Sequence, residues 1–365
     1  MRFRKVIDKF SALHLPVFVA GFFTVWGLYL RFASRAQKDL WTDEIWQISI
    51  IKQNFSDFIR TLPEKAFCSY LEGDYFLTYP FYRIFGDNKW GLAIPHMITT
   101  CLGFYLFYLI ARKYFKTVWG YLVAYSVFCF NATLIEHALE IRAWSVMPTL
   151  ALGIFYFGHL LIDKKFNFTR WKKFWMGAFF VGVIWFHVYG ILMVFLCMIY
   201  VIGANRNTEG FGEVFKRNIL FFAGVLLIAL PLWFYSVFIE HLDSGTIPSI
   251  RPFEFIPNPL EDMQKFLKVV FGTLLGFKKL YFLYGGLLLS VLLPHQDRLK
   301  QLAFFLILVI FPIELILMMD VKTKYWFIQR QFIWVMPLFA ILLGWSWESC
   351  VVYLGNRFKC RREKV

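Results

Sequence analysis

The chain has 365 residues, of which 59% are hydrophobic and 17% charged, and its mean hydropathy is +0.56. This composition excludes a soluble globular protein, and long apolar runs without alternation exclude a membrane barrel. The net charge of +15 is divided into short clusters between the apolar runs, as the positive-inside rule expects, so it does not indicate nucleic-acid binding. We therefore predict an all-α polytopic membrane protein with about ten transmembrane helices, because each helix satisfies its own backbone hydrogen bonds in lipid.

The apolar runs define the expected topology. The spans are predicted at residues 14–32, 92–111, 118–133, 144–162, 174–187, 189–204, 219–238, 280–293, 301–319 and 332–348. The basic start and the basic end place both termini in the cytoplasm. We expect residues 1–350 to form one membrane domain and residues 351–365 a cytoplasmic tail, with no separate soluble domain. A bacterial inner or plasma membrane is the expected location.

The first outer segment, about residues 33–91, is expected to contain two helices. Apolar residues recur at helical spacing over residues 45–60 with polar residues between them, which predicts one amphipathic helix on the membrane surface. An aromatic-rich helix is predicted over residues 74–85, ending at Gly86.

Three further segments have simpler interpretations. The first apolar run lacks a small-residue cleavage site, which favours a retained anchor over a signal peptide. A short amphipathic piece is expected on the inside before residue 219. The second outer loop, about residues 239–277, is rich in proline and is expected to hold a surface helix after Pro259.

Two adjacent carboxylates, Asp43 and Glu44, lie just outside the first span between Trp41 and Trp46. An acidic pair near lipid is costly and has no anchoring role, so it is the first candidate for chemistry. The structural alternative is helix capping by Thr42 or Asp43, because a helix N-terminus favours carboxylates by ~0.3–1 kcal/mol. Neighbouring helical residues point ~100° apart, so one carboxylate is expected to face a site while the other caps or pairs.

A second charged group follows the third span. Glu136 and Glu140 would share a face of a helix, where like charges repel, so the pair is expected to need a cation or a raised pKa. Arg142 follows directly. The alternative is an outer turn that pairs with lipid headgroups or loop lysines.

Polar residues also mark the later spans. His187 and Tyr189 join two spans, with Gly190 making the turn, and such residues commonly anchor at the interface. Arg330 opens the last span, where an arginine often reaches the headgroups, and Lys324 precedes it.

Two ionisable residues are expected inside spans. Glu314 follows Pro312, and an intramembrane carboxylate indicates either function or a pairing across spans. His96 follows Pro95 and is interpreted as a hydrogen-bonded interior histidine. No metal-ligand, P-loop or dinucleotide motif is present, so we predict neither a metal nor a cofactor.

The order of these stretches is distinctive. Along the chain they read Leu40-Trp-Thr-Asp-Glu44, Ile84-Phe-Gly-Asp-Asn-Lys-Trp90-Gly-Leu-Ala-Ile-Pro95, Leu139-Glu-Ile-Arg-Ala-Trp144, His187-Val-Tyr-Gly190 and Arg330-Gln-Phe-Ile-Trp-Val-Met-Pro337. Together with the topology, this order resembles the GT-C superfamily of membrane glycosyltransferases. It is most similar to the branch of protein O-mannosyltransferases and lipid A aminoarabinose transferases, the family 39-like proteins.

The resemblance implies a sugar on a polyprenyl phosphate as donor, a general base in the first outer loop and a basic residue after the third span for the donor phosphate. These roles correspond to Asp43, with Glu44 as the fallback, and to Arg142. Arg330, Glu140, His187 and Tyr189 match less specific family positions. We take Arg330 and Lys324 as further candidates for binding the donor phosphate, and Glu140, His187 and Tyr189 as candidates for binding the substrate. Family members often have a His-Pro-Pro-like stretch before the aromatic helix, whereas this chain reads Glu72-Gly73-Asp74-Tyr75, which makes Asp74 a further substrate-binding candidate.

We therefore expect an inverting transfer of a sugar to an acceptor hydroxyl on a glycan, lipid or protein, at the outer face of the membrane. The alternative is a transporter or flippase in which Glu314, Arg142 and Arg330 line a path. That alternative predicts broken helices in two corresponding halves, and the sequence shows no such symmetry. A non-catalytic scaffold is the third interpretation, in which Asp43 is dispensable.

Overall fold

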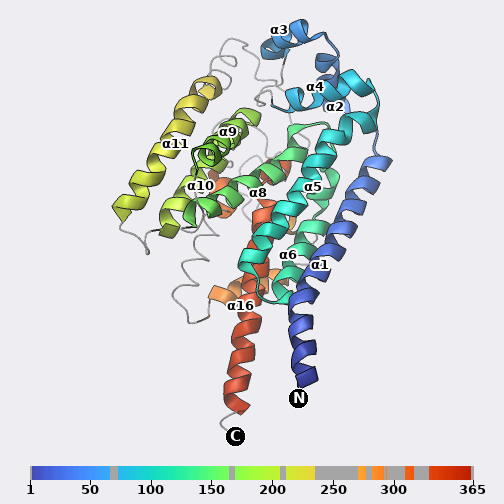
Figure 1. Ribbon diagram of the computed structural model, residues 1–365. Helices are drawn as coiled ribbons and strands as arrows, with labels where there is room; N and C mark the ends of the chain where they lie inside the picture. Colours follow the sequence, from blue (N-terminus) through green and yellow to red (C-terminus); the bar gives the residue numbers. More distant parts are fainter. Residues whose placement is uncertain are drawn as a thin grey trace, which may run out of the picture. The chain divides into compact units, whose positions relative to one another are not determined.

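The computed structural model describes residues 2–65, 73–163, 169–205, 211–234, 270–276, 282–291, 293, 309–315 and 329–362. All regular structure in these residues is helical, in agreement with the predicted all-α class (Figure 1). The chain forms two compact units. Unit 1 contains Met1–Gln37, Cys101–Ala138 and Pro252–Val365, and unit 2 contains Lys38–Thr100 and Leu139–Arg251.

Among the described residues, four helices are long and apolar enough to cross a membrane. They are α1 (Arg2–Gln37) through its part Leu15–Gln37, α5 (Lys89–Tyr114), α8 (Ala143–Ile162), and α16 (Met336–Arg362) through its part Met336–Arg357. Shorter apolar helices are α6 (Val118–Phe130), α10 (Gly190–Asn205) and α11 (Phe211–Phe234). These helices coincide with expected spans, and the chain is therefore an integral membrane protein.

The expected surface helix after Pro259 lies outside the described residues. Parts of the eighth and ninth expected spans also lie outside the described residues. The described parts are α14 (Leu283–Val291) and the helical residues 309–315. Glu314 lies in that short stretch and is exposed.

The prediction of a single amphipathic helix over residues 45–60 is wrong. The structure has two helices there, α2 (Thr42–Ile51) and α3 (Phe55–Lys65). Asn54 separates them. Its Oδ1 accepts a hydrogen bond from the Asp57 backbone N–H at 2.9 Å, as a helix N-cap does. The break lets the apolar faces of two short helices turn toward a common core.

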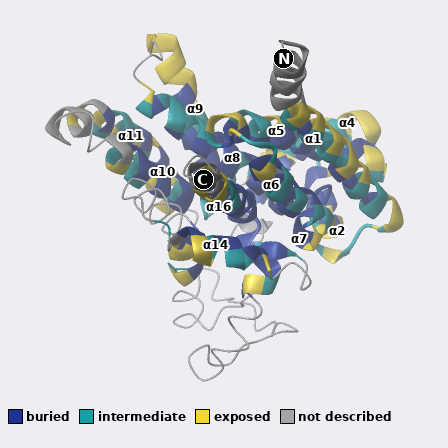
Figure 2. Cartoon of the chain, turned by 90° about the horizontal axis from the view of Figure 1, so that it is seen from below, coloured by how far each residue is buried: buried dark blue, intermediate teal, exposed yellow. Residues whose placement is uncertain are grey.

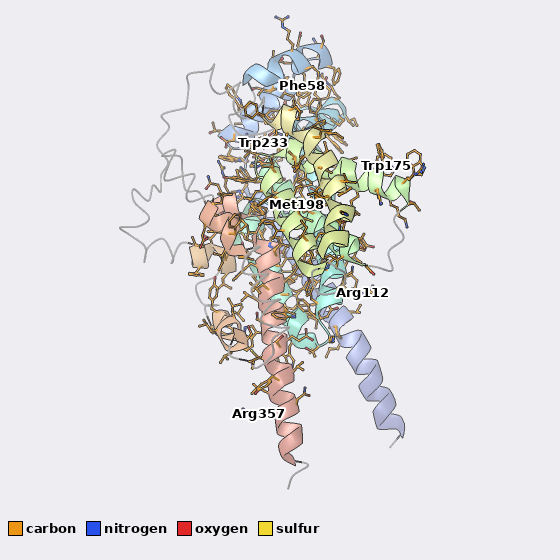
Figure 3. The ribbon with its side chains drawn as sticks, turned by 90° about the vertical axis from the view of Figure 1, so that its left-hand side faces the viewer. Phe58, Arg112, Trp175, Met198, Trp233 and Arg357 are labelled. Carbon is orange, nitrogen blue, oxygen red and sulfur yellow. The ribbon has the colours of Figure 1, made fainter. Side chains whose placement is uncertain are left out.

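The core of unit 2 lies between α2, α3 and α4 (Gly73–Phe85). Its buried members are Ile48, Ile50, Ile51, Phe58, Leu62, Tyr75, Leu92 and Ile141. Phe58, labelled in Figure 3, stacks on Tyr79 with 4.6 Å between ring centroids. Burying each large apolar side chain stabilises such a core by roughly 1.5–3 kcal/mol. Ile141 belongs to this core, so the segment before α8 is held against the outer-loop helices.

Glycines set two boundaries in unit 2 as predicted. Helix α4 ends at Gly86, whose φ of 59° is in the left-handed region that favours glycine. Helix α9 (Arg170–Phe186) and α10 are joined by the turn at His187 that ends in Gly190. A Cβ on Gly190 would lie 2.0 Å from the Val183 carbonyl oxygen, so only glycine fits there.

Helices α9, α10 and α11 pack against one another (Figure 1). The amphipathic piece expected before residue 219 and the span that follows it form one continuous helix, α11, as far as Phe234, because no proline or glycine separates them at the expected junction.

Burial differs sharply between α8 and the beginning of α9 (Figure 2). Most residues of α8 are buried and none is exposed. The first turns of α9 carry exposed Trp171 and Trp175 beside exposed Lys172 and Lys173, and Trp175 points away from the helices around it (Figure 3). Tryptophan next to lysine is typical of a membrane–water interface.

Unit 1 contains charged side chains inside apolar helices, and they hold both ends of α6. Arg31 of α1 donates to the carbonyl oxygens of Phe128 and Cys129 at 2.9 and 3.3 Å. Glu348 of α16 accepts from the backbone N–H groups of Lys116 and Thr117, both at 2.7 Å. A carboxylate at a helix N-terminus and a guanidinium at its C-terminus satisfy the end groups and complement the helix dipole.

Candidate active site

The two adjacent carboxylates of the first outer loop have different surroundings. Glu44 is fully buried, its Oε1 accepts from the Ile141 N–H at 2.8 Å, and its Oε2 accepts from the Trp41 N–H at 3.2 Å. Glu44 thereby joins the first turn of α2 to the segment before α8. The structural alternative named the wrong cap residues, because Trp41 is the residue before the helix and Glu44 reaches back to it. Its expectation of carboxylates at the helix N-terminus is confirmed, since Asp43 and Glu44 both lie in the first turn of α2.

Asp43 is the carboxylate that faces a cation. Its side chain is 28% exposed, and its Oδ2 lies 3.7 Å from Nη2 of Arg142, whose side chain is 3% exposed. Nη1 of Arg142 also donates to the Asp43 carbonyl oxygen at 3.4 Å. One guanidinium thus holds both the backbone and the carboxylate of Asp43, and that carboxylate remains accessible to a reactant.

Asp74, at the start of α4, is buried beside this pair. Its Oδ2 accepts from Nε2 of Gln47 on α2 at 2.5 Å. Burial raises the pKa of Asp74 to about 7; the Gln47 hydrogen bond and the Arg142 charge oppose this rise, and the Glu44 charge adds to it. Asp74 therefore exchanges a proton near neutral pH, unlike an ordinary aspartate.

His96 of α5 is buried and hydrogen-bonded, as the sequence predicts. Its Nδ1 lies 2.7 Å from Oγ of Ser145 and 3.9 Å from Oδ1 of Asp74. Its Nε2 lies 3.5 Å from Oγ1 of Thr78. The sequence does not predict that His96 lies close to Asp74. A polar residue within an apolar span indicates that polar partners are present, because it is costly there without them, but it does not indicate which residues they are.

His187 and Tyr189 form an aromatic group with Trp144 at the start of α8. The His187 and Trp144 ring centroids are 4.8 Å apart, and Nδ1 of His187 accepts from the Tyr189 N–H at 3.2 Å. Burial and the nearby charge of Arg142 lower the pKa of His187 to about 3. His187 is therefore neutral at physiological pH and contributes a hydrogen-bonding ring, not a cation.

Glu140 lies outside any helix. Helix α7 (Ala132–Glu136) ends at Glu136, so the predicted shared helical face of Glu136 and Glu140 is wrong. The chain leaves the helical conformation at His137. The alternative pairing with a loop lysine is confirmed, because Oε1 of Glu140 lies 3.9 Å from Nζ of Lys38.

Two of the predicted donor-phosphate residues belong to another part of the chain. Arg330 lies in the short helix η3 (Gln329–Phe332) of unit 1, and Lys324 lies outside the described residues. Within the part of the chain that the structure describes, no three His, Cys, Asp or Glu side chains come together as a metal ion would require.

The two hydrogen bonds that the Glu44 carboxylate accepts predict that removing this side chain lowers the stability of the protein. Glu44→Ala removes two hydrogen bonds to a carboxylate, which should lower the free energy of unfolding by about 3 kcal/mol. Thermal unfolding of the purified protein measures this, with Asp39→Ala as control because Asp39 is an exposed carboxylate nearby. An unchanged melting temperature for Glu44→Ala would contradict the structural role.

Comparisons with known proteins come from structure alone. No family model and no curated protein matches the sequence. The solved structures that match include ArnT from Cupriavidus metallidurans in the apo state and bound to undecaprenyl phosphate, with TM-scores of 0.55 and 0.54. Each is 16% identical over 89% of this chain, and this chain covers 58% and 59% of the two ArnT chains. The chain is thus structurally similar, at the level of the fold, to ArnT, a GT-C lipid A aminoarabinose transferase.

Proposed function

We propose that the protein is an integral membrane glycosyltransferase that moves a sugar from a polyprenyl phosphate to an acceptor hydroxyl on the outer face of the membrane. The ArnT-like fold supports this class. The observation that carries the proposal is the pairing of a partly exposed carboxylate, Asp43, with a buried guanidinium, Arg142, at 3.7 Å. Such a transfer needs these two chemical groups next to each other.

Asp43 is the proposed general base. It takes the proton of the acceptor hydroxyl while that oxygen bonds to the anomeric carbon and the bond from this carbon to the phosphate oxygen breaks. The released electron pair stays on the phosphate. Positioned proton transfer contributes about 10²–10⁴-fold to such a rate. One displacement from the face opposite the leaving group inverts the anomeric configuration.

Arg142 is the proposed ligand of the donor phosphate. Negative charge grows on the leaving phosphate, and a guanidinium can donate two hydrogen bonds to it at once. A fixed donor in a site poor in water can be worth about 3 kcal/mol in the transition state. The burial of Arg142 and its bond to the Asp43 backbone favour such a fixed position.

Asp43 suits the role of base better than its neighbours. Both oxygens of Glu44 accept backbone hydrogen bonds, and Asp74 is 2% exposed, whereas the Asp43 side chain is 28% exposed. Glu140, His187 and Tyr189 are proposed to contact the substrate. For Arg330 and Lys324 the role of donor-phosphate ligand stays a prediction from the sequence.

The proposal is tested with purified protein in liposomes that contain a panel of short-chain polyprenyl-phosphate sugars and candidate acceptors. We expect free polyprenyl phosphate and a glycosylated acceptor, detected by mass spectrometry. Movement of an intact lipid-linked sugar across the bilayer without its cleavage would instead support a flippase.

A further inference from the structure

Two hydroxyl oxygens lie next to the ring nitrogens of His96. Oγ of Ser145 donates its hydrogen to the Arg142 carbonyl oxygen at 2.8 Å, and Oγ1 of Thr78 donates its hydrogen to the Asp74 carbonyl oxygen at 2.9 Å. A hydroxyl has one hydrogen, so in this arrangement Oγ of Ser145, 2.7 Å from Nδ1 of His96, accepts from that nitrogen. Nε2 of His96 lies 3.5 Å from Oγ1 of Thr78 and is the ring nitrogen at which a further hydrogen can be held.

The partner of Asp74 tolerates either charge state of the carboxyl. The amide of Gln47 donates to the Asp74 carboxylate in the arrangement described. Turned about its last torsion, the same amide presents its oxygen, which accepts from a carboxylic acid. Oδ1 of Asp74 is buried, has no hydrogen-bond partner among the described residues, and lies 3.9 Å from Nδ1 of His96.

The carboxylates close to Arg142 link the binding of an anion there to the uptake of a proton. The carboxylates of Asp43 and Asp74 both lie close to the Arg142 guanidinium, and the charge of Glu44 adds to the rise in the pKa of Asp74. Burial keeps His187 neutral. The negative charge of an arriving phosphate would favour protonation of the groups around it.

We propose that Asp74 and His96 share one proton, and that this proton is taken up when an anionic phosphate binds at Arg142. The inference rests on the proposed function in assigning the phosphate to Arg142. The shared proton belongs to the pair, not to either residue. Ser145 connects the shared proton to Arg142, the proposed phosphate-binding residue. Its Oγ accepts a hydrogen bond from His96 and donates one to the backbone carbonyl of Arg142.

The coupling has a defined pH window. In the free protein the pKa of Asp74 is raised to about 7, so the proton is already present well below that pH and must be taken up above it. Affinity for the phosphate should therefore fall by up to about tenfold per pH unit above this pKa. The second ionisation of a phosphate monoester, near about pH 6, contributes little there.

Isothermal titration calorimetry tests the inference with undecaprenyl phosphate and the full-length protein in nanodiscs. Titrations at about pH 8 in two buffers of different ionisation enthalpy give the protons exchanged on binding. We expect the wild type to take up nearly one proton, and Asp74→Asn and His96→Gln to take up far less. Asp87→Asn is the matched control, because Asp87 is 63% exposed and pairs with Lys52 outside this cluster.

Equal proton uptake by the wild type and Asp74→Asn would overturn the inference while leaving the proposed function intact, provided that Arg142→Lys weakens binding. Binding that Arg142→Lys leaves unchanged would contradict the phosphate site itself. The wild type and both isosteric variants are compared by thermal unfolding. If Asp74→Asn is unfolded, the proton count of His96→Gln decides alone.

Discussion

Asp43→Asn is expected to reduce sugar transfer by about 10²–10⁴-fold, because an amide cannot take the acceptor proton. Binding of the lipid-linked donor should persist, since the change preserves shape and leaves Arg142 in place. It also removes the negative charge 3.7 Å from the guanidinium, so donor affinity should stay equal or rise. Single-turnover release of polyprenyl phosphate measures the first effect, and a donor-binding titration measures the second.

The control for this variant is Asp39→Asn, which makes the same chemical change at an exposed position four residues earlier. It should transfer sugar at the wild-type rate. Full activity in Asp43→Asn would exclude Asp43 as the base. Loss of donor binding that parallels the loss of transfer would assign Asp43 to binding instead.

Arg142→Lys is expected to weaken donor binding by about 10²-fold, which corresponds to roughly 3 kcal/mol. Lysine keeps the positive charge that the neighbouring carboxylates need, so the fold should survive. It loses the planar fork that donates two hydrogen bonds to a phosphate. Titration with undecaprenyl phosphate measures the change, and acceptor binding should be affected much less.

Arg83→Lys is the matched control for Arg142→Lys. Arg83 is exposed on α4 and lies over the ring of Tyr79, 4.7 Å from its centroid. Its replacement should leave donor affinity unchanged. An equal loss in both variants would indicate a general effect of arginine at the membrane surface, and an unchanged affinity in Arg142→Lys would remove Arg142 from the phosphate site.

Several elements could be predicted because their signals are local. An apolar run of helical length defines α8, and a glycine ends α4 at Gly86. The turn between α9 and α10 could be predicted from its glycine, Gly190. The structure requires glycine there because a Cβ would clash with the Val183 carbonyl oxygen. Short-range chemistry is sufficient in each case.

The break between α2 and α3 was missed although a local signal existed. Asn54 precedes Asp57 by three residues and caps the second helix with its side chain. The helical spacing of apolar residues over 45–60 continues across the break, so periodicity alone predicts one helix. A cap residue should therefore interrupt a periodic pattern even where the periodicity continues.

Other contacts could not be predicted because the partners are far apart in sequence. Glu348 accepts hydrogen bonds from residues more than 230 positions away, and Glu44 from Ile141, 97 positions away. The sequence indicated that only one of Asp43 and Glu44 would face a site. Which one it is depends on Ile141 and Arg142, whose position relative to α2 is set by tertiary packing.

The most direct test is an experimental structure of the protein in nanodiscs with bound undecaprenyl phosphate, the lipid present in one of the matching ArnT structures. The proposed function predicts phosphate oxygens within about 3 Å of the Arg142 guanidinium, with the Asp43 carboxylate facing the same space. A phosphate bound elsewhere, with Arg142 still held only by Asp43, would contradict it.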